Sequence, residues 1–188
     1  NAIGYAHDED ATRVSAYRFP EFLFDLLGRN APRIHMVAHS MGNRLLIPAL
    51  AALDGKDTGR IARIGQVVLA AADINVKEVN QVAAQLAALP KKTGNRITIY
   101  ASTNDLALRL SSLVHWFTRL GEASPKMFVF HDLDSVDVSG AALSRRAFGH
   151  SYLFDSAKVQ ADIRLLLQDN AGPNKRPLLA LGHNAKDG

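Results

Sequence analysis

The chain has 188 residues, of which 47% are hydrophobic and 21% are charged. This composition is typical of one globular domain that buries a sizeable core. There is no cysteine, which excludes disulfides, thiolate metal sites and a cysteine nucleophile. The net charge is +4, but the basic residues come as scattered pairs such as Lys91-Lys92 and Arg145-Arg146, without the basic stripe of a nucleic-acid-binding surface. We therefore expect no nucleic-acid partner.

Neither a membrane span nor a targeting signal is visible in the sequence. No run approaches the roughly 18 to 20 consecutive apolar residues that a membrane-spanning helix needs. The first residues, Asn-Ala-Ile-Gly, lack the basic and apolar regions of a signal peptide. These features predict a domain that does not cross a membrane, and they favour the cytoplasm over export.

Strand and helix patterns alternate along the chain. Two helices are predicted first, 9–19 and 20–27, because Pro20 is suited to the first turn of a new helix. Short apolar runs then predict strands at 33–38, 66–71, 96–101 and 126–131, each followed by apolar residues at helical spacing. Such alternation predicts a mostly parallel sheet with helices on both faces, an α/β three-layer sandwich. This domain is predicted to cover residues 1–168. The composition of residues 169–188 predicts an extended or mobile tail.

The first predicted strand runs into the pattern AHSMG, a serine between small residues at a strand-to-helix junction. A turn this tight exposes Ser40 as a nucleophile and brings the residues two before and two after it, Ala38 and Gly42, against neighbouring backbone, so both must be small. The backbone N–H of Met41 and the start of the helix would stabilise a developing oxyanion. We expect the side chains of His39 and Met41 to pack rather than react. The alternative interpretation is that Ser40 only caps the helix.

An activated serine needs a general base, and the base needs an orienting carboxylate on another loop after a strand. We prefer Asp105 as this acid to the alternative Asp73, because Asn104 is expected to cap the following helix and to leave Asp105 free. Weaker alternatives are the acids of a later loop, Asp132, Asp134 and Asp137. Arg44 is expected to pair with an acid beneath the site.

The predicted base is His150, in the stretch AFGHSYLFDS. It follows the last predicted strand and a flexible Gly149, so that its loop can reach back to the serine. The other histidines are weaker candidates, since His115 lies within a helical pattern, His131 ends a predicted strand and His183 lies in the tail. A serine, an acid and a histidine thus follow one another in the order that a catalytic triad of this architecture requires.

The segments VAHSMGNRLL, AADIN, YASTNDLALRLS, DSVDVSG and GHSYLF, in this order, resemble an uncharacterised bacterial branch of the α/β-hydrolase superfamily over about residues 10–168. The resemblance implies an α/β-hydrolase fold with Ser40 as nucleophile, Asp105 as acid and His150 as base. Such hydrolases carry strands and a His-Gly oxyanion loop before the serine, and nothing in this sequence matches them. The chain therefore looks N-terminally incomplete, and strand 33–38 would become an exposed edge open to self-association.

The expected function is that of an esterase-like or lipase-like serine hydrolase, acting on a carboxylic ester or related acyl compound of small size. No cofactor and no metal is expected. An alternative is a non-catalytic or incomplete hydrolase scaffold that acts as an interaction module. Acyl transfer to an alcohol or amine would use the same three residues and remains open.

Overall fold

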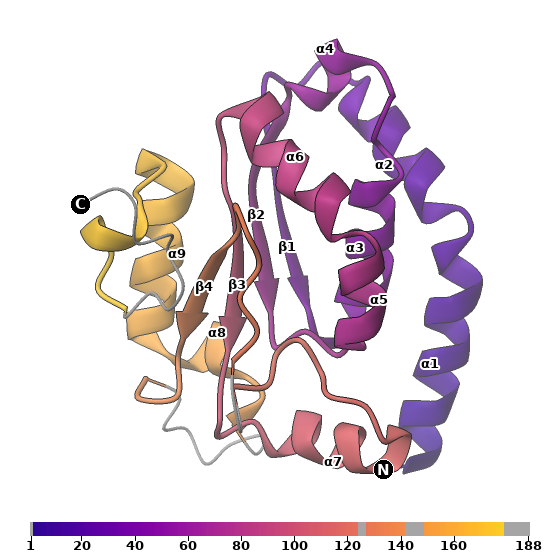
Figure 1. Ribbon diagram of the computed structural model, residues 1–188, viewed down its shortest axis with the longest axis vertical. Coiled ribbons are helices and arrows are strands. Elements are labelled where there is room, and N and C mark those ends of the chain that lie inside the picture. The colour runs from indigo at the N-terminus through magenta and orange to yellow at the C-terminus, as the bar shows by residue number, and fades with distance from the viewer. Residues whose placement is uncertain (1, 124–126, 142–148, 179–188) are drawn as a thin grey trace.

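The computed structural model describes residues 2–123, 127–141 and 149–178, and a four-stranded sheet lies at its centre (Figure 1). The strands are β1 (Ile34–His39), β2 (Ile64–Ala70), β3 (Ile97–Ala101) and β4 (Asp134–Asp137). The helices are α1 (Ala2–Ala16), α2 (Phe19–Leu27), α3 (Asn43–Ala51), α4 (Thr58–Ile61), α5 (Val76–Gln81), α6 (Ala83–Thr93), α7 (Leu106–His115), α8 (Tyr152–Asp155) and α9 (Ala157–Asp169), with short 3-10 helices η1 (Ser40–Gly42) and η3 (Pro173–Lys175). The strands are parallel in the order β1-β2-β3-β4, so their carboxyl ends share one edge.

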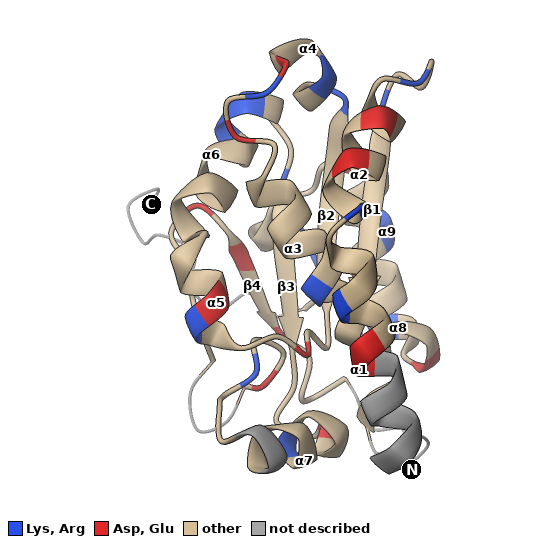
Figure 2. Ribbon diagram, turned by 90° about the vertical axis from the view of Figure 1, so that its right-hand side faces the viewer, with Lys and Arg blue, Asp and Glu red and all other residues tan. Residues whose placement is uncertain are grey.

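Helices cover both faces of the sheet and complete a three-layer sandwich (Figure 1). One face packs on α2, α3 and α6 through a core that includes Leu27, Ile47 and Leu86. The other face packs on α8 and α9 through a second core that includes Val159 and Leu166. Strands β1, β2 and β3 carry no charged residue, whereas many charged residues lie on the outer helices (Figure 2). The predicted fold class is confirmed.

Most predicted elements are present close to their predicted bounds. The strands expected at 33–38, 66–71 and 96–101 correspond to β1, β2 and β3, with each boundary shifted by at most two residues. Pro20 lies in the first turn of α2 and separates it from α1, as expected for a residue that fixes φ and lacks an N–H. Short apolar runs therefore predict these three strands, of which β2 and β3 are buried along their whole length.

The fourth strand was predicted wrongly. The sequence predicts it at 126–131, but the described residues of that run form no strand, and β4 begins at Asp134. The apolar run still contributes burial, since Phe130 belongs to the core on the α3 side. Aspartate is unfavourable in strands, but Arg96 and Arg176 bind the Asp134 carboxylate at 3.3 and 3.4 Å. Ion pairs with residues distant in the sequence therefore stabilise β4 at this position, which a local apolar pattern does not indicate.

The segment after α9 is held in place where the structure describes it. The predicted extended or mobile tail begins at Asp169, and its residues beyond 178 lie outside the described part. Within that part, the buried guanidinium of Arg176 lies 3.4 Å from Asp162, and Asn170 accepts a 2.8 Å hydrogen bond from Gln66. Residues 170–178, which include the short 3-10 helix η3, are therefore anchored to α9 and β2.

Helix α7 buries Leu108 but has its other described leucines on the outside. Leu110 and Leu113 are 63% and 72% exposed, whereas Ser111 is buried and its hydroxyl donates to Asp73 at 2.9 Å. The helix exists as the spacing predicts, but the leucine face points away from the core. Within the described residues, no helix combines the length and the apolar character needed to cross a membrane.

Strand β1 lies at one edge of the described sheet. Met36 and Ala38 are buried on the α3 side, but Val37, on the opposite side, is 50% exposed. A groove of about 400 Å³ lies beside Val37 and is otherwise lined by residues of α8 and α9 such as Leu153 and Ile163. The helices that cover β2 thus leave this side of β1 partly open.

Candidate functional site

The turn at Ser40 has a strained backbone that two other elements hold in place. Ser40 has a φ of +53°, which is uncommon for a residue other than glycine and costs of order 1–3 kcal/mol. Its carbonyl oxygen accepts hydrogen bonds from Asn43 Nδ2 at 3.0 Å and from the Asp73 N–H at 3.2 Å. Asn43 is fully buried and also donates to the Ala70 carbonyl at the end of β2. The conformation of Ser40 is therefore fixed from both α3 and β2.

The Ser40 side chain does not cap a helix. The residue that precedes η1 is His39 and the residue that precedes α3 is Gly42, and neither end has a side-chain cap. The steric argument for Gly42 is also wrong here, because a Cβ at this position would meet no described atom within 4 Å. Ala38 is buried in the core, as a small residue there should be. The helix-cap interpretation thus loses its support, and the turn depends less on Gly42 than the pattern suggests.

Asp105 and His150 are brought together although 45 residues separate them. His150 Nδ1 lies 2.8 Å from Asp105 Oδ2 and 3.0 Å from Oδ1. Asp105 is completely buried, and its Oδ1 also accepts the Leu108 N–H at 3.0 Å, so it caps α7 itself. Asn104, which the sequence suggested as the cap, instead donates to the Ser139 carbonyl at 2.8 Å. Asp105 therefore combines two roles that the sequence argument had separated.

The loop before His150 approaches the loop before Asp105 at Gly149. This glycine has a φ of +77°, and a Cβ on it would lie 2.3 Å from the Asn104 carbonyl oxygen. Glycine is needed here both for the left-handed backbone and for the close approach. The sequence suggested that Gly149 makes the loop flexible. In the structure, glycine is instead required because the two loops pack closely at this residue.

Asp73, the alternative acid, is engaged in a different network. Its carboxylate lies 3.1 Å from Arg44 and 3.1 Å from Arg119, and it accepts the Ser111 hydroxyl at 2.9 Å. Arg44 also pairs with Glu9 at 2.6 Å, so the expected acid partner of Arg44 is present. The Asp73 main chain therefore lies beside that of Ser40, but the Asp73 carboxylate forms ion pairs with two arginines and contacts no described histidine.

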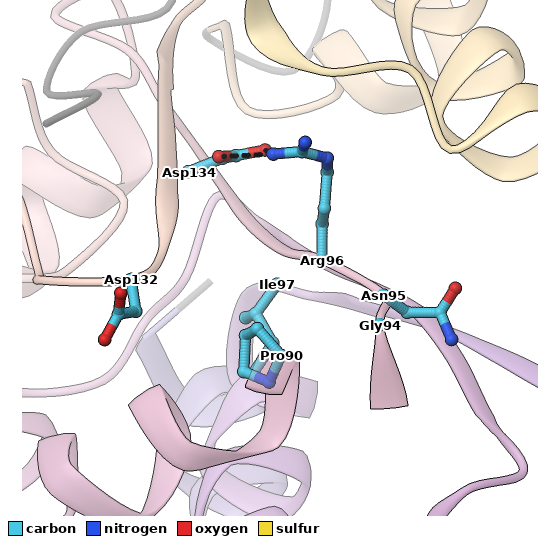
Figure 3. A pocket seen from close by; sticks show the side chains of 7 residues that line it. All are labelled: Pro90, Gly94, Asn95, Arg96, Ile97, Asp132 and Asp134. Atoms are coloured by element: carbon cyan, nitrogen blue, oxygen red, sulfur yellow. Dashed lines mark hydrogen bonds and ion pairs between the residues drawn. The ribbon is translucent and has the colours of Figure 1, made fainter. Parts of the chain in front are cut away.

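The weaker acid candidates lie elsewhere or have other partners. Asp132 pairs with Lys91 at 2.7 Å, and Asp137 accepts the Ser139 N–H at 2.8 Å. Asp134 opens β4 and binds Arg96 at 3.3 Å, and both residues line a pocket of about 230 Å³ (Figure 3). This pocket lies at the amino ends of β3 and β4, at the opposite end of the sheet from Ser40.

None of the weaker histidine candidates is seen to contact Asp105 in the described part of the chain. His131 is exposed in a turn, where it contacts Asp132 at 2.7 Å. The side chain of His115 and the whole of His183 lie outside the described part of the chain. Among the described residues, no group of three or more histidine or acidic side chains converges as metal ligands would.

His39 contributes more than the packing that the sequence predicts. Its Nε2 lies 2.9 Å from the His150 carbonyl oxygen, and the two imidazole centroids are 4.8 Å apart. A carbonyl oxygen can only accept, so His39 donates its Nε2–H. Burial lowers the pKa of His39, although the hydrogen bond to the His150 carbonyl opposes this shift. No sequence signal identifies this contact, because it depends on a residue 111 positions away.

Tyr152 is a further residue that sequence reasoning missed. Its hydroxyl accepts the Ala71 N–H at 2.6 Å and donates to the Tyr100 carbonyl at 2.7 Å. It therefore joins the carboxyl ends of β2 and β3 and fixes α8 directly after His150. A tyrosine in this position of the sequence does not by itself indicate a structural role. The role of Tyr152 becomes clear only from the partners of its buried hydroxyl in the structure.

A family model described as "Alpha/beta hydrolase of unknown function (DUF900)" matches residues 1–168. The chain belongs to this family. No curated protein and no solved structure gives a significant match. The superfamily resemblance drawn from the sequence is thereby confirmed, and this alpha/beta hydrolase places Ser40, Asp105 and His150 in loops at the same edge of its parallel sheet.

Proposed function

We propose that this alpha/beta hydrolase is a serine hydrolase that cleaves a carboxylic ester or a related acyl compound. The observation that carries the proposal is the contact between the buried Asp105 carboxylate and His150 Nδ1 at 2.8 Å. A buried carboxylate that orients an imidazole at the carboxyl ends of parallel strands is the arrangement a serine nucleophile needs. Ser40 follows strand β1 at the same edge of the sheet and has a backbone strained at that point.

Each of the three side chains has a defined part in the proposed reaction. A carboxylate can only accept, so His150 donates Nδ1–H to Asp105, and the Nε2 lone pair remains to act as base. Ser40 Oγ attacks the acyl carbonyl carbon while its proton passes to Nε2. His150 then returns this proton to the departing alcohol, which leaves an acyl-serine. A water molecule, deprotonated in the same way, releases the carboxylic acid and restores Ser40.

The oxyanion that forms in each step needs a donor close to Ser40. The Met41 N–H follows Ser40 in η1 and is the donor that we assign. The strained Ser40 backbone sets the orientation of this turn. The Ser40 carbonyl oxygen accepts hydrogen bonds from Asn43 Nδ2 at 3.0 Å and from the Asp73 N–H at 3.2 Å, which hold that backbone in place. The proposal thus uses main-chain atoms of the turn for electrostatic stabilisation and side-chain atoms for proton transfer.

Covalent labelling with a fluorophosphonate probe tests this function. The intact protein should be labelled at Ser40, and Ser40→Ala should abolish labelling. Ser15→Ala, a change of an exposed serine on α1, is the matched control and should be labelled like the native chain. Absence of labelling on the intact protein, or equal labelling of Ser40→Ala, would rule the proposal out.

A second candidate function, that of an interaction module, is favoured by the open edge at β1. Val37 is half exposed there beside a groove with Leu153 and Ile163. An unpaired edge strand with an exposed apolar residue is a template for pairing with another chain. Analytical ultracentrifugation should then show association that Val37→Lys removes. A monomer at all concentrations tested would count against this candidate.

A further inference from the structure

His39 links the turn at Ser40 to the segment that carries His150. It is the last residue of β1 and directly precedes Ser40. Its Nε2–H donates to the His150 carbonyl at 2.9 Å, and its ring lies 4.8 Å from the His150 ring at an interplanar angle of 58°. The centroid of the Phe154 ring lies 5.3 Å from that of His39, in a T-shaped arrangement. One imidazole therefore contacts both ends of the segment from His150 to Phe154.

The two contacts of His150 come from different strand ends and hold different parts of the residue. Asp105, which follows β3, binds the imidazole through Nδ1 at 2.8 Å. His39, at the end of β1, binds the main-chain carbonyl. The ring orientation and the backbone position of His150 are thus set separately. A hydrogen bond to the backbone restricts how far the base can move from the turn at Ser40.

We propose that His39 is a positioning residue for the hydrolysis, which holds the main chain of His150 so that its imidazole stays within reach of Ser40. This role rests on the proposed function. His39 acts through His150 and exchanges no proton with the substrate. The titratable groups that act on it are His150 and, behind it, Asp105. An uncharged His39 allows the neighbouring imidazole to become positive during the reaction without repulsion between the two rings.

Two substitutions separate the hydrogen bond of His39 from its ring packing. His39→Phe keeps an aromatic ring against His150 and Phe154 but removes the donor. His39→Gln removes the ring but keeps an amide N–H that can reach a carbonyl. His131→Phe, in an exposed turn, controls for the loss of a histidine elsewhere. Each is compared with the native protein for hydrolysis of p-nitrophenyl acetate and for the rate of fluorophosphonate labelling.

The positioning role predicts a specific pattern of kinetic changes. His39→Phe should lower kcat and the labelling rate by about 10-fold to 100-fold, with KM changed by less than about twofold. His39→Gln should recover most of this loss, and His131→Phe should match the native protein. Full activity in His39→Phe, or equal losses in His39→Phe and His39→Gln, would overturn the proposal.

A second readout does not depend on activity. Proton NMR should show a downfield Nδ1–H signal of His150, bound to Asp105, that is present in the native protein and in His39→Gln. The same signal should be broadened or lost in His39→Phe. If native hydrolysis persists in Ser40→Ala while this signal still depends on His39, the proposed function fails and the positioning of His150 by His39 stands. A signal unchanged in His39→Phe contradicts the positioning itself.

Discussion

Gly149 and Asn104 lie in such close contact that a single methyl group on Gly149 would come within 2.3 Å of the Asn104 carbonyl oxygen. The two residues immediately precede His150 and Asp105. The contact therefore links the loops that present these two side chains, and it sets the space that separates them.

Gly149→Ala should be destabilising and should separate His150 from Asp105. The left-handed backbone at a φ of +77° costs an alanine about 1 kcal/mol or more, and the clash with Asn104 adds to it. We expect a lower midpoint of urea unfolding and a slower rate of fluorophosphonate labelling per folded molecule. Gly42→Ala is the matched control, because a Cβ there meets no described atom within 4 Å, and its stability should equal or slightly exceed the native value. A greater loss in Gly42→Ala than in Gly149→Ala would contradict the packing described for both glycines.

Asp105→Asn and Asp73→Asn should separate activity from stability. An asparagine at 105 can still cap α7 through its Oδ1 but has no charge for His150, so labelling should fall by on the order of 10³-fold to 10⁴-fold while unfolding changes by less than about 1 kcal/mol. An asparagine at 73 leaves Arg44 and Arg119 without their buried carboxylate, which costs about 3–5 kcal/mol. Urea unfolding and labelling per folded molecule measure the two effects. If Asp73→Asn were as stable as the native protein but unlabelled, Asp73 would replace Asp105 as the acid.

On α7, the serine should matter more for stability than the leucine. Ser111 donates to Asp73 at 2.9 Å and accepts from Arg119 at 3.1 Å, so Ser111→Ala should cost about 1–3 kcal/mol. Leu113 is 72% exposed, and Leu113→Ala should change the free energy of unfolding by less than about 0.5 kcal/mol. Thermal and urea unfolding of the two variants provide the comparison. The reverse order would mean that the leucine face of α7 is buried in solution.

The protonation of His39 should make stability depend on pH. Burial lowers its pKa below the ordinary value of 6.5, with His150 and Asp105 as the neighbouring titratable groups. The unfolded chain then takes up a proton before the folded protein does, so stability from this group is present above about pH 6.5 and is lost as the pH falls towards the lower folded pKa. Urea unfolding between pH 7.5 and 5.5 should show a steeper loss for the native protein than for His39→Phe. Equal pH slopes would show that His39 titrates alike in both states.

Local sequence predicted the parts of this fold that local forces determine. Strands β2 and β3 are buried along their whole length, and burial on both faces of a parallel sheet requires continuous apolar runs. The turn at Ser40 could be predicted because a strand, a serine between small residues and a helical pattern follow one another directly in the sequence. The proximity of Asp105 and His150 followed from chain order, since both belong to loops at the carboxyl edge.

The errors arose where distant residues decide the local structure. Strand β4 contains Asp134, which is tolerated because Arg96 and Arg176 bind it. The outward leucines of α7 reflect the buried bonds of Ser111, which favour the opposite face of the helix. The contact of His39 with His150 likewise exists only after the sheet and α8 have come together. Polar partners far apart in sequence leave no periodic pattern from which they could be predicted.

Tyr152 also bears on the order in which the site is built during synthesis. Its hydroxyl bonds the ends of β2 and β3, two residues after His150. A ribosome releases Ser40 and Asp105 well before Tyr152, because chains emerge from the N-terminus. A nascent chain that ends before α8 therefore lacks both the His150 contact of Asp105 and the hydroxyl that joins β2 to β3, so the proposed reaction waits until the domain is nearly complete.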